Sequence, residues 1–186
     1  MTIIAFASAS EFAGWLKTNH AVSSGVWVEI AKKGAGRASV SYDEALDVAL
    51  SFGWIDGQKK PKDAMAWLQR FAPRRSRSLW SKRNRERAER LIRSRKMKAA
   101  GLREVEQARR DGRWDAAYDS PSKAEIPDDF LRALAKNKKA KAFFDTLNKA
   151  NRYAIAWRLQ TARKPDTRQR RLQMILEMMT QGRKFH

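Results

Sequence analysis

Hydrophobic and polar residues alternate with two different periods in the first seventy or so positions, which predicts helices mixed with strands. Residues 8–11 form a capping-box pattern ahead of apolar residues at helical spacing, so we expect a first helix that ends at Asn19. Alternation over 26–31 predicts a strand. A second capping box at 41–44 opens a second amphipathic helix, which ends at 52–53, where a glycine favours helix termination.

The stretch that follows predicts a hairpin. Residues 54–58 and 65–71 are rich in apolar and aromatic side chains, and the polar, proline-containing segment 59–63 between them predicts a turn. The order helix, strand, helix, strand, strand is typical of a small antiparallel sheet with helices on one face.

Beyond Pro73 the period is helical throughout. We expect a strongly cationic helix over 81–96, an interruption at 99–101 and a second helix over 102–111. The polar segment 119–125 contains a proline and lacks large apolar residues, so it predicts a linker. After it, apolar spacing predicts four helices: one from 126–129, one carrying Phe143, Phe144 and Leu147, one carrying Ala150 to Trp157, and one from about Asp166 or Thr167.

These elements predict an α+β protein with a small antiparallel sheet and flanking helices in its N-terminal half, a helical middle and an all-helical C-terminal module. The predicted domains are 1–118, an α+β domain with a basic helical extension, and 126–186, a helical module, joined by the linker 119–125. A chain of 186 residues is long enough to bury a sizeable core in such an arrangement.

Composition excludes several classes of site. The chain has no Cys, which rules out disulfides, thiol catalysis and Cys-based zinc sites, and its two His residues make a His metal cluster unexpected. We therefore expect no metal and no cofactor. No apolar run is long enough for a membrane span, and the apolar start lacks the basic leader of a signal peptide, so the sequence predicts a cytoplasmic protein.

The formal charge of +20 is unevenly distributed. Residues 70–113 hold 17 Lys or Arg against 5 Asp or Glu, and 127–186 hold 15 against 5, whereas 1–69 are neutral overall. Segregated positive charge indicates an anionic partner, with nucleic acid the commonest class and an anionic membrane surface second. The alternative is a basic surface that affects solubility alone.

The first candidate site combines a carboxylate with an arginine-rich turn. Asp56 follows a Trp and precedes a Gly, and Arg74 and Arg75 precede a helix expected to begin between Ser78 and Ser81. Helix N-termini and Arg side chains both favour anions, so these two arginines and two serines are the predicted anion-binding residues. Asp56 is interpreted as a structural carboxylate that ties the strand end to the arginine turn through Arg74 and Arg75, with a general base or a ligand contact as the alternative; no catalytic residue is assigned.

A second cationic cluster stands at the predicted start of the last helix. It consists of Arg163, Lys164, Arg168, Arg170 and Arg171, and the residues predicted to bind an anion are Arg163, Lys164, Arg168 and Arg171. Cations gain nothing from the dipole at a helix N-terminus, which makes a bound anion plausible there as well.

Several motifs together resemble the YdeI/OmpD-associated family, also called bacteriocin-protection proteins. They are Phe-Gly-Trp-Ile-Asp-Gly at 52–57 (with Gly53, Trp54, Asp56 and Gly57), Pro-Arg-Arg at 73–75, Ser78-x-Trp80-Ser81-x-x-Asn84, Ala-Gly at 100–101, Gly-x-Trp at 112–114 and Ala-Arg-Lys-Pro-x-Thr-Arg-x-x-Arg at 162–171. The match spans nearly the whole chain. Family members often have a glycine two residues before Met97, where this chain has Arg95. The resemblance implies a bacterial cytoplasmic protein with a recurring module at about 126–183, and it brings no catalytic reaction.

Three functions remain open at this point. The first is a non-enzymatic anion- or nucleic-acid-binding protein linked to envelope stress or bacteriocin and peptide protection. The second is an enzyme of unknown reaction with a pocket at Asp56, Arg74 and Arg75. The third is a protein-interaction factor whose basic surface is incidental.

Overall fold

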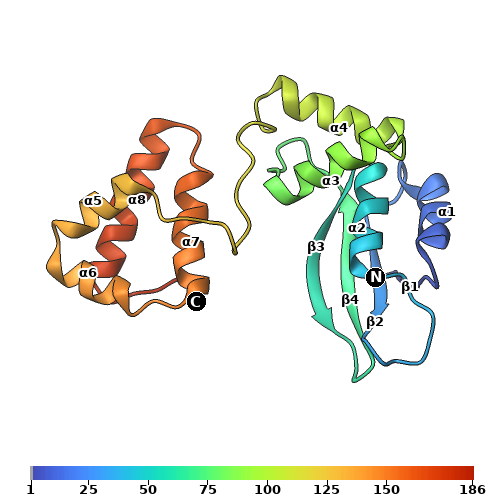
Figure 1. Ribbon diagram of the computed structural model, residues 1–186, viewed down its shortest axis with the longest axis horizontal. Coiled ribbons are helices and arrows are strands. Elements are labelled where there is room, and N and C mark those ends of the chain that lie inside the picture. Colours follow the sequence, from blue (N-terminus) through green and yellow to red (C-terminus); the bar gives the residue numbers. More distant parts are fainter. Residues whose placement is uncertain (1) are drawn as a thin grey trace. The chain divides into compact units, whose positions relative to one another are not determined.

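The computed structural model describes residues 2–186, and the α+β class is confirmed (Figure 1). The elements in chain order are β1 (Ile3–Ala5), α1 (Ala9–Asn19), β2 (Val26–Ala31), α2 (Tyr42–Ser51), β3 (Trp54–Pro61), β4 (Ala66–Pro73), α3 (Lys82–Arg93), α4 (Ala99–Arg110), α5 (Asp128–Ala135), α6 (Lys138–Asp145), α7 (Lys149–Gln160) and α8 (Pro165–Thr180). They form two compact units. The N-terminal unit holds the described residues up to Ser78 together with Asn84–Asp115, and the C-terminal unit holds Leu79–Arg83 and Ala116–His186.

The sheet of the N-terminal unit has four strands in the order β1-β2-β4-β3. The pairs β2–β4 and β3–β4 are antiparallel as expected, but β1 pairs with β2 in parallel. The expectation of a purely antiparallel sheet was therefore wrong at this edge. The strand β1 has only three residues, too few for a period to show in the sequence.

The hairpin differs from its prediction at the turn. Lys59, Lys60 and Pro61 were expected in the turn, yet they pair with β4 and extend β3 to eight residues. The amines of Lys59 and Lys60 lie 4.1 and 4.7 Å from the ring centroids of Trp67 and Trp27. These cation–π contacts favour the extended backbone over a turn.

Both N-caps lie where the sequence placed them, but only the second is a full capping box, because the Glu11 side chain accepts from the Ala7 amide instead of the Ser8 amide. The Ser8 hydroxyl accepts from the Glu11 amide at 3.3 Å, and Ser41 and Glu44 cap α2 reciprocally. Ring contacts of Phe12 with Phe71 and of Tyr42 with Trp67 place α1 and α2 on one face of the sheet. Arg70 and Ala72 alternate onto the other face.

The connection from α3 to α4 corrects two expectations. α3 ends at Arg93, three residues earlier than expected, and Arg95 adopts φ = 56°, the left-handed region that favours glycine. Residues 99–101 begin α4 instead of interrupting a helix. An alanine Cβ built at Gly101 would lie 2.4 Å from the Ser51 carbonyl oxygen, so the missing side chain lets α4 pack directly against the end of α2.

The C-terminal unit contains the four predicted helices, α5 to α8, around one apolar core. The buried residues of this core are Phe130, Leu134, Ala140, Phe144, Leu147, Ile155, Leu159, Leu172, Ile175 and Met179. The segment 119–125, expected to be a linker, is anchored at its start, because Asp119 pairs with Lys82 at 2.7 Å and accepts from Gln160 at 2.7 Å. Among the described residues, none of the helices has the length and apolarity needed to cross a membrane.

Candidate functional site

The motif at 52–57 begins with two structural residues. Gly53 adopts φ = 77° directly after α2, and its carbonyl accepts from the Arg74 amide at 3.0 Å, which joins the start of β3 to the end of β4. Trp54 is buried, and its indole donates to the His20 carbonyl at 3.1 Å. These contacts give both residues a role in the fold.

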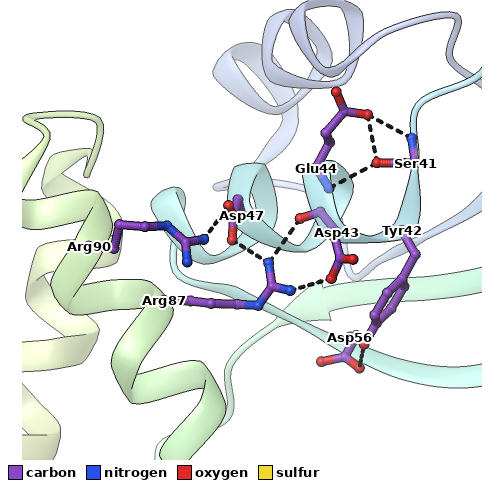
Figure 2. A network of polar contacts seen from close by, with 8 residues as sticks. All are labelled: Ser41, Tyr42, Asp43, Glu44, Asp47, Asp56, Arg87 and Arg90. Carbon is purple, nitrogen blue, oxygen red and sulfur yellow. Dashed lines mark hydrogen bonds and ion pairs between the residues drawn. The ribbon is translucent and has the colours of Figure 1, made fainter.

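Asp56 is held by an aromatic hydroxyl. It pairs with Phe71 on β4, so its side chain lies on the face that carries α1 and α2, and there the Tyr42 hydroxyl donates to it at 2.8 Å (Figure 2). Asp56 makes no ion pair with any described residue, so the expected tie to the arginine turn is absent. The carboxylate is half-buried and engaged by α2.

A β-bulge follows Asp56. The register shifts between Asp56 and Lys59, which leaves Gly57 and Gln58 opposite Arg70 alone. The buried Gln69 amide donates to the carbonyls of Gly57 at 2.9 Å and Gln58 at 3.3 Å, and so satisfies the backbone groups that the bulge unpairs.

Beside the bulge lies a pocket of about 600 Å³, which we name the Arg pocket. The residues that line it are Ser24, Ile55, Asp56, Gly57, Gln58, Arg70, Ala72, Pro73, Arg74, Arg75 and Ser78. Arg74 is buried, with 7 % of its surface exposed, whereas Arg70 and Arg75 are exposed. The structure thus brings together Arg74, Arg75 and Ser78, three of the predicted anion-binding residues.

A tight turn fixes the lip of the Arg pocket. The Ser78 hydroxyl accepts from the Arg75 amide at 3.1 Å, and the Ser78 carbonyl accepts from Arg113 at 2.9 Å. Arg113 is itself oriented by Asp111. Burial opposes ionisation of Asp111, but the hydrogen bonds from Arg113 outweigh it and lower the pKa of this carboxyl.

The expected helix N-terminus does not belong to this pocket. α3 begins at Lys82, and Ser81 pairs with Tyr118 in an isolated parallel bridge of the C-terminal unit. Trp80 is buried and Asn84 is half-buried, and neither lines the pocket. Ser81 and the first residue of α3 therefore do not line the pocket that Arg74 and Arg75 line.

The cations of α3 are partly neutralised within the N-terminal unit. Arg87 pairs with both Asp43 and Asp47 of α2, and Arg90 pairs with Asp47 at 2.6 Å (Figure 2). Burial acts to lower the pKa of Arg87, but the hydrogen bond and charge of Asp47 and the charge of Asp43 raise it overall. These arginines attach α3 to α2 and are occupied by internal partners.

The second predicted cluster also has internal contacts. Arg168 donates to the Leu159 carbonyl at 2.7 Å and pairs with Asp129 at 2.8 Å, and Arg171 donates to the Arg158 carbonyl at 2.7 Å. Both arginines thereby satisfy carbonyls at the end of α7. Arg163 and Lys164 are exposed residues just before α8.

Sequence reasoning missed Arg70, Gln58 and Ser24, which also line the Arg pocket. Arg70 carried one usable signal, because it is the charged residue of the predicted strand 65–71. Ser24 lies in the loop before β2 and reaches the pocket through the β2–β4 pairing alone.

Comparison with known proteins yields two family matches. Residues 4–104 match a family described as a domain of unknown function (DUF8412), and residues 123–182 match one described as "Bacteriocin-protection, YdeI or OmpD-Associated". No curated protein and no solved structure matches the chain. The second match confirms the YdeI/OmpD-associated resemblance over 123–182, while the motifs at 52–57 and 73–84 fall within the first. Since the first match covers more than half of the chain, the chain belongs to the DUF8412 family, and it carries a YdeI/OmpD-associated domain in its C-terminal unit.

Proposed function

We propose that the protein is a non-enzymatic binding protein for a phosphate-bearing anion, with the Arg pocket as its binding site. One observation carries the proposal: three arginines line a pocket whose lone acidic lining residue, Asp56, is turned toward Tyr42. Among the described residues, Asp56 therefore forms no ion pair with the exposed arginines Arg70 and Arg75.

The exposed arginines are suited to a ligand. The Arg75 side chain makes no ion pair or hydrogen bond with a described residue, and Arg70 makes a single long contact of 3.5 Å to the Ser24 carbonyl. Guanidinium groups bind phosphate oxygens through planar, bidentate hydrogen bonds. Ser78, fixed by the turn at the pocket lip, adds a hydroxyl beside them.

A small ligand fits the geometry better than a nucleic acid does. The pocket volume of about 600 Å³ is in the range of small-molecule sites. Arg87 and Arg90, which would extend a basic surface along α3, are paired with Asp43 and Asp47. The formal charge of +20 then accelerates encounter with anions without selecting a polymer.

The test measures pyrophosphate binding by calorimetry at low salt. Arg75→Gln is expected to weaken binding about tenfold, the effect of removing one charge-assisted hydrogen bond. Arg93→Gln is the matched control, because Arg93 is exposed, carries the same charge and lies outside the pocket. Equal affinity of the two variants would contradict the proposal.

A second experiment tests binding of nucleic acid. Binding of a single-stranded oligonucleotide is measured over a salt series, where each neutralised phosphate adds about −0.7 to the log–log slope. If the oligonucleotide binds tightly with a steep salt dependence and pyrophosphate does not bind, the ligand is a nucleic acid and the proposal of a small ligand is wrong.

Asp56→Asn separates the binder from an enzyme that uses the same pocket. Since Asp56 faces Tyr42, the substitution is expected to change pyrophosphate affinity by less than about threefold. A loss as large as that of Arg75→Gln would show that Asp56 contacts the ligand, and would favour the enzyme.

In the cell we propose a role in bacteriocin or peptide protection, for which the support is the word "Bacteriocin-protection" in the description of the C-terminal family. A cytoplasmic location is part of the same proposal and rests on the sequence alone. A strain that lacks the gene is complemented with the wild type, Arg75→Gln or Arg93→Gln and challenged with a bacteriocin. Rescue by the wild type and by Arg93→Gln, but not by Arg75→Gln, is expected. Equal rescue by all three would favour a role through protein contact.

A further inference from the structure

A second hollow of the N-terminal unit shares no residue with the Arg pocket. It lies between α1, the end of α2 and the start of α4, has a volume of about 540 Å³, and is named here the α1/α4 groove. Its lining residues are Ser10, Ala13, Gly14, Lys17, His20, Phe52, Lys98, Ala99, Ala100 and Arg103.

The floor of the groove is apolar because α1 presents small residues to it. Ala13 and Gly14 lie one turn or less from Ser10 and Lys17, and the Phe52 ring closes the side formed by α2. A Cβ built at Gly14 meets no atom within 4 Å. The groove is therefore open at the position where a larger side chain of α1 would fill it.

Its rim is cationic. Lys17, Lys98 and Arg103 are exposed and make no ion pair with a described residue, and none of the described residues that line the groove is acidic. α4 begins at the same rim, with Lys98 as an N-cap that makes no side-chain hydrogen bond and no acid in the first turn. The amide ends of this helix add positive potential to the three side chains.

The groove continues past Phe52 into an adjoining hollow of about 470 Å³, which shares Ala13, Phe52 and Lys98 with it. Val48 and Leu91 give that hollow apolar surface, and its charged lining is mixed, with Glu44 and Asp47 beside Arg95 and Lys96. The α1/α4 groove thus carries cations without an acid, whereas the adjoining hollow carries charges of both signs, so an anionic head group is favoured at Lys17, Lys98 and Arg103 and an apolar chain can extend past Phe52.

We propose that the α1/α4 groove binds an aliphatic carboxylic acid, with its carboxylate at Lys17, Lys98 and Arg103 and its chain along Ala13, Gly14 and Phe52. The apolar floor favours the aliphatic chain, and the cationic rim, which makes no ion pair with a described residue, favours the carboxylate. The proposal does not depend on anion binding in the Arg pocket, because the two sets of lining residues are disjoint.

Decanoate is the probe, and binding is measured by calorimetry together with amide chemical shifts. The wild type is expected to bind it with shifts confined to α1, α4 and the residues around Phe52. Each added methylene in a series of shorter acids is expected to tighten binding about fourfold while the chain lies in the groove. Decanol, which has the same chain without the charge, is expected to bind at least about tenfold more weakly.

Two pairs of variants locate the site. Gly14→Leu fills the groove and is expected to abolish binding, whereas Gly14→Ala adds a single carbon in open space and is expected to retain it. Arg103→Gln is expected to weaken decanoate about tenfold without affecting decanol, while Arg93→Gln changes neither. Thermal unfolding of each variant verifies the fold, and Gly14→Leu is expected to unfold no earlier than the wild type.

Three results would overturn the proposal. Undiminished binding to folded Gly14→Leu would place the acid elsewhere. Equal affinity for decanol and decanoate would show that the cationic rim does not contribute to binding of the carboxylate. Binding to vesicles of anionic lipid without binding to soluble decanoate would make the groove part of a membrane-contacting surface instead of a ligand site.

Discussion

Replacing Gly101 by alanine is expected to destabilise the N-terminal unit, although alanine is the better helix former. The added Cβ would lie 2.4 Å from the Ser51 carbonyl oxygen, 2.6 Å from that of Leu50 and 2.4 Å from the Met97 sulfur. Two of these three neighbours are backbone atoms of α2, which cannot rotate away as a side chain can. α4 must therefore shift away from α2, and the contact between the two helices loosens.

The magnitude follows from two opposing effects. Overpacking of this kind costs typically about 1–3 kcal/mol, and rigid backbone neighbours place Gly101→Ala near the upper end. The gain in helix propensity returns about 1 kcal/mol. The free energy of unfolding is thus expected to fall by about 2 kcal/mol, which shifts a urea midpoint by about 1 M.

Gly14→Ala is the matched control, because the same substitution sits inside α1 with no atom within 4 Å of the new Cβ. It is expected to raise the free energy of unfolding by up to about 1 kcal/mol, so the two variants should shift stability in opposite directions. Urea unfolding is followed by tryptophan fluorescence, to which this unit contributes five of the seven Trp residues, Trp15, Trp27, Trp54, Trp67 and Trp114. Gly101→Ala as stable as the wild type would refute the close approach of α4 to α2.

Three further substitutions test other contacts. Arg95→Gly is expected to raise the free energy of unfolding by about 1 kcal/mol in urea titrations, because φ = 56° strains a residue with a side chain; a loss of stability would argue against that backbone. Glu29→Gln is expected to lower the melting temperature at neutral pH, and the gap to the wild type is expected to narrow as pH falls: the Lys62 hydrogen bond lowers the pKa of Glu29 despite burial, so its stabilisation is lost as pH falls through the folded-state pKa, and a gap unchanged by pH would contradict this. Asn151→Ala is expected to lower the free energy of unfolding by about 2–3 kcal/mol in calorimetry and to release residues 185–186, because the side-chain oxygen of the buried Asn151 accepts from the backbone amides of Phe185 and His186 at 3.0 Å. Unchanged hydrogen-exchange protection of these two amides would contradict this role.

Local signals explain which elements could be predicted. The N-caps at Ser8 and Ser41 and the apolar stripes of the last four helices depend on residues within one or two turns of each other, so they can be predicted from the sequence. The strand β1 was not predicted, because three residues are too few to show a hydrophobic period and because its extended conformation depends on parallel pairing with β2. Gly101 was wrongly predicted to interrupt a helix, because its role is to let α4 approach the backbone of α2, a helix distant in the sequence.

The candidate site could be predicted only in part for the same reason. Arg74, Arg75 and Ser78 are close in sequence and meet in the Arg pocket, but Arg70 and Ser24 join them through strand pairing. Asp56 was expected to face the arginines, yet its place opposite Phe71 turns it to Tyr42. Which face of the sheet a strand residue occupies depends on register, and the bulge after Asp56 sets that register.

The sequence by itself determined the fold class, the helices with local caps, the kinship of residues 123–182 and the excess of positive charge. Only the tertiary structure decided which cations remain available to a ligand. Arg87 meets Asp43 across 44 positions and Arg168 meets Asp129 across 39, whereas Arg75 has no such partner among the described residues. The physical reason is that an ion pair requires two side chains within about 4 Å, and for distant residues the packing of helices and strands alone sets that distance.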